Sequence, residues 1–179
     1  MYLMAQIIGI LGVSTFLLSY QLKKRKNIIV VNALSSVLYV LQYIMLGAFE
    51  GAALDILAAV STVAAHNKDK GFIKRHTKLV ITILTLSFCV AGMVFYKNIF
   101  SLCSVTGAIL QNSAFWITKE KILRRVSFAA SPFWLIYNLT SGAYGSAIGS
   151  ALSIVSIGLA IFRYDILGQK GPKNINETA

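Results

Sequence analysis

The chain has 179 residues, a mean hydropathy of +0.70 and only 13% charged residues, well below the roughly 25% of ordinary soluble domains. Long unbroken apolar runs with charges clustered between them exclude a soluble globular domain, and they lack the alternating short strands of a membrane β-barrel. The net charge is +11. The basic residues flank the apolar runs, where the signals for membrane topology are found, so we do not expect a nucleic-acid partner. The composition predicts an all-α integral membrane protein whose main partner is the lipid bilayer.

Seven apolar stretches follow one another, each close to the roughly 20 residues that a helix needs to cross a bilayer. They cover residues 3–21, 28–46, 49–66, 79–96, 99–117, 126–141 and 144–162. The first has no basic leader and no cleavage site, so we expect it to be retained as a span. The third and sixth are the weakest, because they contain Asp55 and Pro132. Residues 1–167 should form a single transmembrane domain, followed by a disordered cytoplasmic tail at 168–179.

Basic residues follow the first, third, fifth and seventh stretches. If every stretch crosses the membrane, all but Lys97 of the 17 Lys and Arg residues lie on one side. If either weak stretch failed to cross, basic loops would lie on both faces. The positive-inside rule therefore predicts seven spans with the N-terminus outside and the C-terminus inside.

The two halves of the chain resemble each other at a constant offset of 94 residues. Tyr43 then meets Tyr137, Gly51 meets Gly145, and in each half a Gly-containing turn joins two stretches. We interpret residues 1–66 and 99–165 as two three-helix repeats, joined by a linker helix at 79–96. Each repeat has three helices, so two repeats joined directly would be inverted relative to each other. The additional span between them makes them parallel, as in transporters whose substrate site lies between the halves.

Three motifs carry a family resemblance over about residues 1–165. They are Gln6-x-x-Gly9, then Ser19-Tyr20-Gln21 with the basic residues 23–26, and residues 46–53 (LGAFEGAA). With these motifs the chain resembles the YgjV family of bacterial inner-membrane proteins. Its 3+1+3 plan is similar to SWEET and PQ-loop transporters and to nicotinamide-riboside carriers. This resemblance implies a multi-pass protein of the bacterial inner membrane.

The chain also departs from the SWEET-like pattern. Those proteins resemble one another in several helix prolines, whereas Pro132 is the only proline in a predicted span here. They place a polar pair on the third helix of each repeat, where this chain has Asp55 and Gly149. A sugar-transport mechanism therefore does not carry over.

Six residues are candidate substrate contacts. Asp55 is the only acidic residue well inside a predicted span, where a carboxylate is costly and typically functional; a water funnel from the near face is the alternative. The others could bind a solute, but interhelical hydrogen bonds or an aromatic belt would explain them equally well. They are Gln42, Gln111, Asn112, Trp134 and Asn138. Pro132 frees a backbone carbonyl and is a candidate hinge, or else a static kink.

The sequence favours a small-solute transporter that works by alternating access between the repeats. The alternative is a receptor, sensor or assembly protein on the same fold. We expect no enzyme activity, because no nucleophile–base set, carboxylate pair or phosphate loop appears. We expect no cofactor and no metal site, since His66 and His76 lack ligand partners at suitable spacing. If there is a substrate, we expect a small polar solute. The sequence does not identify that solute, the coupling ion, the direction of transport or the oligomeric state.

Overall fold

The computed structural model describes residues 1–19, 25–117 and 119–168, and this part of the chain is helical with short connections. The last α-helix continues as a π-helical turn, η1 (Ile161–Ile166). The α-helices are α1 (Tyr2–Ser19), α2 (Arg25–Met45), α3 (Phe49–His66), α4 (Gly71–Arg75), α5 (Thr77–Val94), α6 (Ser101–Trp116), α7 (Glu120–Thr140) and α8 (Tyr144–Ala160).

These helices confirm the all-α prediction and lie close to the predicted stretches. The largest difference is at α7, which begins at Glu120 rather than at 126. Its first turns are rich in Glu, Lys, Leu and Arg, which favour helix whether or not the segment is apolar. The short α4 also forms inside a basic loop where no helix was expected, and the last helix runs on to Ile166. The predicted disordered tail covers residues 168–179. Of these only Gly168 is described, and residues 169–179 lie outside the described residues.

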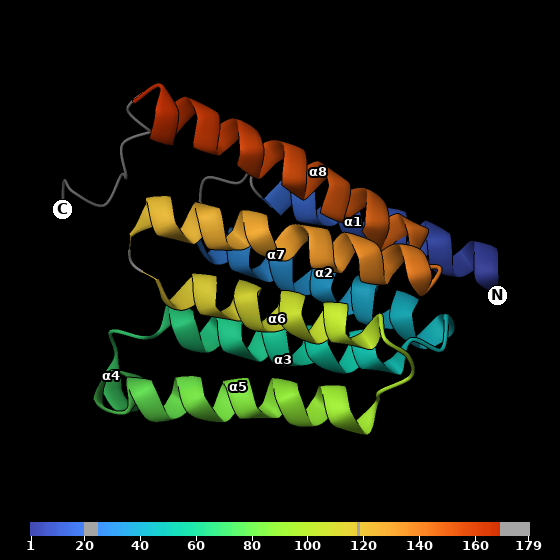
Figure 1. Cartoon of the computed structure of the whole chain (residues 1–179), viewed down its shortest axis with the longest axis horizontal. Helices are drawn as coiled ribbons and strands as arrows, with labels where there is room; N and C mark the ends of the chain where they lie inside the picture. The colour runs from blue at the N-terminus through green and yellow to red at the C-terminus, as the bar shows by residue number, and fades with distance from the viewer. Residues whose placement is uncertain (20–24, 118, 169–179) are drawn as a thin grey trace.

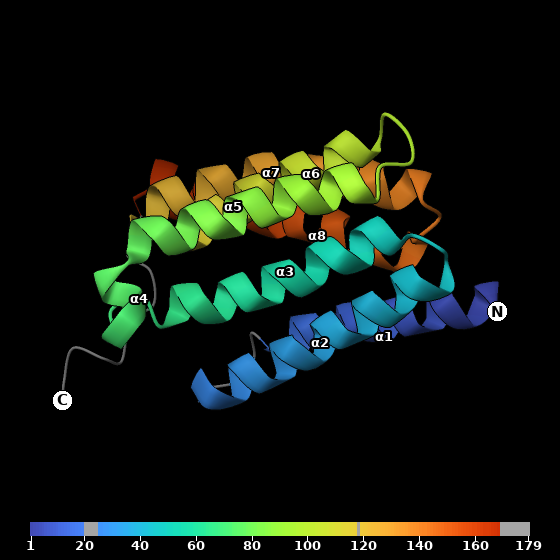
Figure 2. The same ribbon diagram turned by 90° about the horizontal axis from the view of Figure 1, so that it is seen from below.

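The long helices pack side by side as a bundle (Figure 1). Helix α1 packs against α2 and α8, and α6 packs in the same way against α7 and α3. The hairpin pairs α2–α3 and α7–α8 complete a closed ring of six helices. Helix α5 lies outside this ring against α3 and α6, so the predicted linker helix is peripheral (Figure 2).

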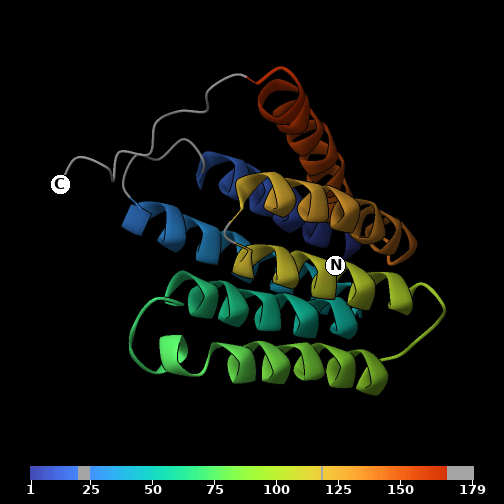
Figure 3. The same ribbon diagram turned by 60° about the vertical axis from the view of Figure 1, so that its left-hand side comes forward.

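The two ends of the bundle differ in charge. The connections α2–α3, α5–α6 and α7–α8 lie at the same end as the N-terminus; we call this the turn end (Figures 1 and 2). Figure 3 shows the α5–α6 and α7–α8 connections together at this end. At the opposite, basic end lie α4, the start of α7 and η1, with their Lys and Arg residues. There Arg124 of α7 pairs with Asp165 of η1 and lies 5.6 Å from the centre of the Tyr164 ring.

The α2–α3 and α7–α8 turns have the same backbone geometry. Gly47 and Gly142 both have positive φ (68° and 72°), which glycine adopts at little cost. The amide of the next residue bonds back to Tyr43 in one turn (2.8 Å) and to Asn138 in the other (2.9 Å). The matching residues of these two turns differ by 95 residues, one more than the offset of 94 expected from the sequence.

Within the part of the chain that the structure describes, three helical segments are long and apolar enough to cross a membrane: Phe49–His66, Thr77–Val94 and Tyr144–Ile166. Two shorter apolar segments, Tyr2–Phe16 and Leu34–Met45, accompany them among the described residues. Large apolar side chains cover the outer faces of these helices, for example Ile56, Leu86 and Val155, each more than half exposed. An apolar exterior of this kind is expected of helices that contact lipid.

Candidate functional site

Buried polar side chains gather near the turn end of the bundle. In a membrane interior such groups need partners within the protein, because no water is present to bond them. The buried set drawn from α2, α3, α6, α7 and α8 consists of Gln42, Glu50, Ser101, Ser104, Asn138 and Ser146. Every long helix of the ring except α1 thus contributes to it, and α1 adds the partly buried Gln6.

A chain of hydrogen bonds ties α2 to α7 and α8. The Tyr43 hydroxyl donates to Oδ1 of Asn138 (2.7 Å), and Nδ2 of Asn138 donates to the Ser150 hydroxyl (3.0 Å). The Ser146 hydroxyl donates to Oε1 of Gln42 (2.5 Å). Both predicted candidates in this group, Gln42 and Asn138, are therefore buried and bonded, and helix packing accounts for these contacts.

Gln6 extends the network to the α7–α8 turn. Its Nε2 donates to the carbonyl of Gly142 (2.6 Å), and its Oε1 accepts from the amide of Gly145 (3.1 Å). Helices α1 and α8 approach very closely here: a Cβ placed on Gly145 would lie 2.8 Å from the backbone of Gly9. Small residues at this crossing let the backbones meet.

Glu50 is the residue that sequence reasoning missed. It is not among the candidates proposed from sequence, yet it lies in the first turn of α3, is only 4% exposed, and accepts a hydrogen bond from Ser104 of α6. Beside it the Gly51 amide donates to the Tyr137 hydroxyl (2.9 Å). Glu50 precedes the buried Leu54 and Ser61 by one and three helical turns. That spacing was the available signal for its burial.

A pocket of about 390 Å³ opens next to Glu50 at the turn end. Its wall comes from the α2–α3 turn, the α5–α6 connection and the end of α7, so it lies between elements of the two halves of the chain. Polar lining groups include Glu50, Ser101, Tyr137 and Lys97. The pocket therefore combines a buried carboxylate, hydroxyl groups and a single cation in the same space.

Asp55 lies on α3 just over one turn beyond the pocket-lining residue Glu50. It is partly buried, and its carboxylate is near enough to the phenols of Tyr43 and Tyr137 to interact with them electrostatically. Asp55 thus belongs to the same region as Gln42 and Asn138. Two carboxylates and two tyrosines from three helices converge there.

Gln111 and Asn112 lie elsewhere, towards the basic end of α6. Asn112 accepts a hydrogen bond from Ser61 of α3, and Gln111 donates to Ser127 of α7 (3.4 Å). Ser61 follows Glu50 by 11 residues, which is about 16 Å along a helix. These two candidates therefore form a second polar group rather than part of the pocket. Nδ2 of Asn112 is buried without a hydrogen-bond partner among the described residues.

Trp134 and Pro132 take different positions on α7. The Trp134 ring packs edge-on against Tyr137 (6.1 Å between centroids), and Gly107 leaves room for it. Trp134 is partly buried and packs against two groups of buried apolar side chains, one around Tyr137 and the other around Leu54 and Phe88. Pro132 is on the exposed face of α7, which continues through it to Thr140.

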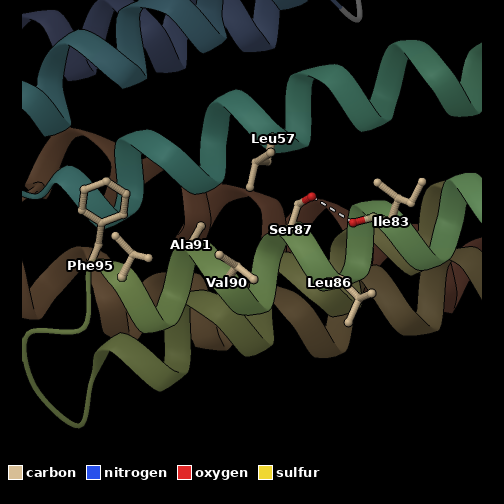
Figure 4. Close-up of a pocket in the computed structure, with 8 residues that line it drawn as sticks. Leu57, Ile83, Leu86, Ser87, Val90, Ala91 and Phe95 are labelled. Atoms are coloured by element: carbon tan, nitrogen blue, oxygen red, sulfur yellow. Dashed lines mark hydrogen bonds between the residues drawn. The ribbon is translucent and has the colours of Figure 1, made fainter.

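A second hollow, on the side of the bundle, has no comparable chemistry. It is an open apolar groove of about 440 Å³ between α3 and α5, lined by Leu57, Ile83 and Phe95 among others (Figure 4). Its one hydroxyl, that of Ser87, donates to the carbonyl of Ile83 (2.9 Å). Because its walls are hydrocarbon and it opens sideways, lipid chains would fill it.

Comparison with known proteins places this helical bundle in a family. No curated protein and no solved structure matches the chain significantly. A family model for bacterial inner membrane proteins, Imp-YgjV, matches residues 3–166. The exposed apolar helix faces agree with that description, and the resemblance read from the N-terminal motifs is confirmed. The chain therefore belongs to the Imp-YgjV family of bacterial inner membrane proteins.

Proposed function

We propose that this protein is a small-solute transporter of the inner membrane. In this proposal seven helices, α1–α3 and α5–α8, cross the bilayer, with the turn end outside and the basic end in the cytoplasm. The gathering of Lys and Arg at one end of the bundle supports this orientation. No chemical step is proposed; the solute would cross unchanged.

The observation that carries the proposal is the polar pocket between the two halves of the chain. A scaffold protein would be expected to fill that interface with apolar side chains. Here Glu50 of the first half is buried beside Ser104 and Tyr137 of the second, and the pocket reaches the turn end. The matching α2–α3 and α7–α8 turns support two parallel three-helix repeats around it.

Alternating access makes a specific demand on the polar pairs between α3 and α6. Ser104, which donates to the pocket residue Glu50, and Ser61 are both fully buried, and Ser61 lies about 16 Å nearer the basic end. If the two halves rock, the region around the outer pair, Glu50 and Ser104, closes while the region around the inner pair, Ser61 and Asn112, opens to the cytoplasm. A receptor on the same fold would need only the outer opening.

Cysteine labelling tests this without knowledge of the substrate. Ser104→Cys and Ser61→Cys are near-isosteric, and the native cysteines, Cys89 and Cys103, would first be replaced by Ala. In oriented membrane vesicles, a membrane-impermeant maleimide should label Ser104→Cys from the outside and Ser61→Cys from the cytoplasmic side. Lys68→Cys, at the basic end, serves as an always-reactive cytoplasmic control. Persistent protection of Ser61→Cys would contradict transport and favour the receptor.

A further inference from the structure

The pocket at the turn end has an acidic floor. Glu50 is 4% exposed, and one carboxylate oxygen accepts from the Ser104 hydroxyl. No salt bridge to Glu50 forms among the residues that the structure describes. The N-terminus of α3 supplies part of a compensating charge. A buried carboxylate without a cationic partner is nevertheless costly, so the pocket is well suited to receive a positive group.

The walls of the same pocket are aromatic. Phe49, Phe95 and Tyr96 are each about half exposed, and the Tyr137 ring lies deeper beside Glu50. Aromatic faces attract ammonium groups through their quadrupole, most strongly where water is excluded. An interfacial aromatic belt would account for rings at this depth, but it would not place a buried carboxylate among them.

Size and the remaining charge narrow the class of ligand. A volume of about 390 Å³ is at the lower end of small-molecule sites, which start near roughly 300 Å³. Lys97 is exposed and lines the pocket, but it does not form a salt bridge with Glu50. It would repel a simple cation weakly, or bind the carboxylate of a zwitterion.

We propose that this pocket binds a small solute carrying an ammonium group, with Glu50 as its counter-ion and the aromatic rings around it. This ligand class rests on the solute site proposed above. Free amines and zwitterions share the ammonium chemistry, and Lys97 distinguishes between them.

The test uses the full-length protein, purified in detergent, and matched probes. Benzylamine, tetramethylammonium and phenylalanine carry the positive group, benzyl alcohol has the shape of benzylamine without the charge, and benzoate has the opposite charge. Calorimetry and thermal unfolding should detect binding of at least one of the three ammonium probes and of neither benzyl alcohol nor benzoate. Equal binding of benzyl alcohol and benzylamine, or no binding of any ammonium probe, would overturn the proposal.

Variants then assign the binding to this pocket. Glu50→Gln keeps an acceptor for Ser104 and removes the charge, so affinity should fall roughly tenfold or more. Asp69→Asn, at the basic end, should change nothing. Tyr96→Leu should also weaken binding, whereas Tyr144→Leu, an exposed ring at the same end, should not; this pair stays informative if Glu50→Gln fails to fold. Unchanged affinity in both pocket variants contradicts the proposal.

Two further results are separable. If the ligand is a zwitterion, Lys97→Gln should weaken the binding of phenylalanine. If the ligand is a simple amine, the same change should leave the binding of benzylamine unchanged or strengthen it. Ammonium binding without cytoplasmic labelling of Ser61→Cys would support the ligand class and contradict transport. Labelling from both sides without ammonium binding would support transport and overturn the ligand class.

Discussion

At the scale of single residues, the turn end depends on side chains that satisfy one another. The Tyr43 and Tyr137 hydroxyls each bond to another helix: Tyr43 donates to Asn138, and Tyr137 accepts from the Gly51 amide. Their rings also flank Gly51, where an added Cβ would lie 3.0 Å from each. A change at either phenol therefore affects both the hydrogen-bond network and the packing of α3.

Replacing Tyr43 by Phe tests the energetic value of this network. The change keeps the ring and leaves the buried Oδ1 of Asn138 without the Tyr43 donor. We expect a loss of about 1 kcal/mol in unfolding free energy, the usual size for interhelical hydrogen bonds in membranes. Tyr144→Phe, at a half-exposed ring, is the control. Equal melting temperatures for the two variants in detergent would show that the Tyr43 bond contributes nothing.

Asp55→Asn tests the second carboxylate of the region. Asn has nearly the same shape and removes a charge that is costly near apolar surroundings, so the fold should be kept and stability should not fall. If Asp55 takes part in the transport cycle, the pH dependence of Ser61→Cys labelling should fall to that of the Lys68→Cys control, which reports only the ionisation of a thiol. Labelling that follows the parent at every pH would reduce Asp55 to a hydrated residue of the helix surface.

At the scale of helices, close approach is decided by glycine. Gly145 lies where α8 meets the backbone of α1, whereas an added Cβ at Gly158 on the same helix would make only an ordinary contact with Phe128 at 3.5 Å. We expect Gly145→Ala to destabilise the bundle by about 1–3 kcal/mol through overpacking. Gly158→Ala should be neutral or stabilising, because Ala favours helix by about 1 kcal/mol over Gly. Thermal unfolding compares the two, and equal losses would refute the close α1–α8 crossing.

Pro132→Ala addresses the proposed hinge in α7. The change restores a backbone donor to a helix that is continuous through Pro132, and the side chain faces outwards, so no core contact is lost. We expect a higher melting temperature together with slower labelling of Ser61→Cys, as when activity needs flexibility. A more stable variant with full labelling rate would mean that Pro132 is only a static kink.

The helices were largely predictable from sequence because apolar length and helix period are local signals. Helix α3 matches its predicted bounds, while α7 was underestimated because its first turns are helical without being apolar. Partners across the bundle are not local. The bounds of the predicted spans already put Gln42 and Asn138 nearer the outer turns than Gln111 and Asn112. The sequence does not give their partners, and the structure places the two sets in different polar groups. Glu50 was missed because its acceptor role depends on Ser104, 54 residues away.

At the scale of the whole molecule, charge and polarity divide the protein into two ends. The basic end has the loops rich in Lys and Arg, and the turn end has Lys97, the pocket and most of the buried polar network. This asymmetry links the fold to the proposed function: positive charge would hold one end in the cytoplasm, and the pocket would then open outside.

The orientation of these two ends is the claim on which the whole account rests, and reporter fusions measure it directly. Paired reporters, one active only in the cytoplasm and one only outside, would be inserted at Glu50, Lys97 and Ser141 and in the loop at Asp69, and fused after Lys173. Seven spans with the turn end outside predict external signal at the first three positions and cytoplasmic signal at the last two. Cytoplasmic signal at Glu50 and Ser141 would contradict the account.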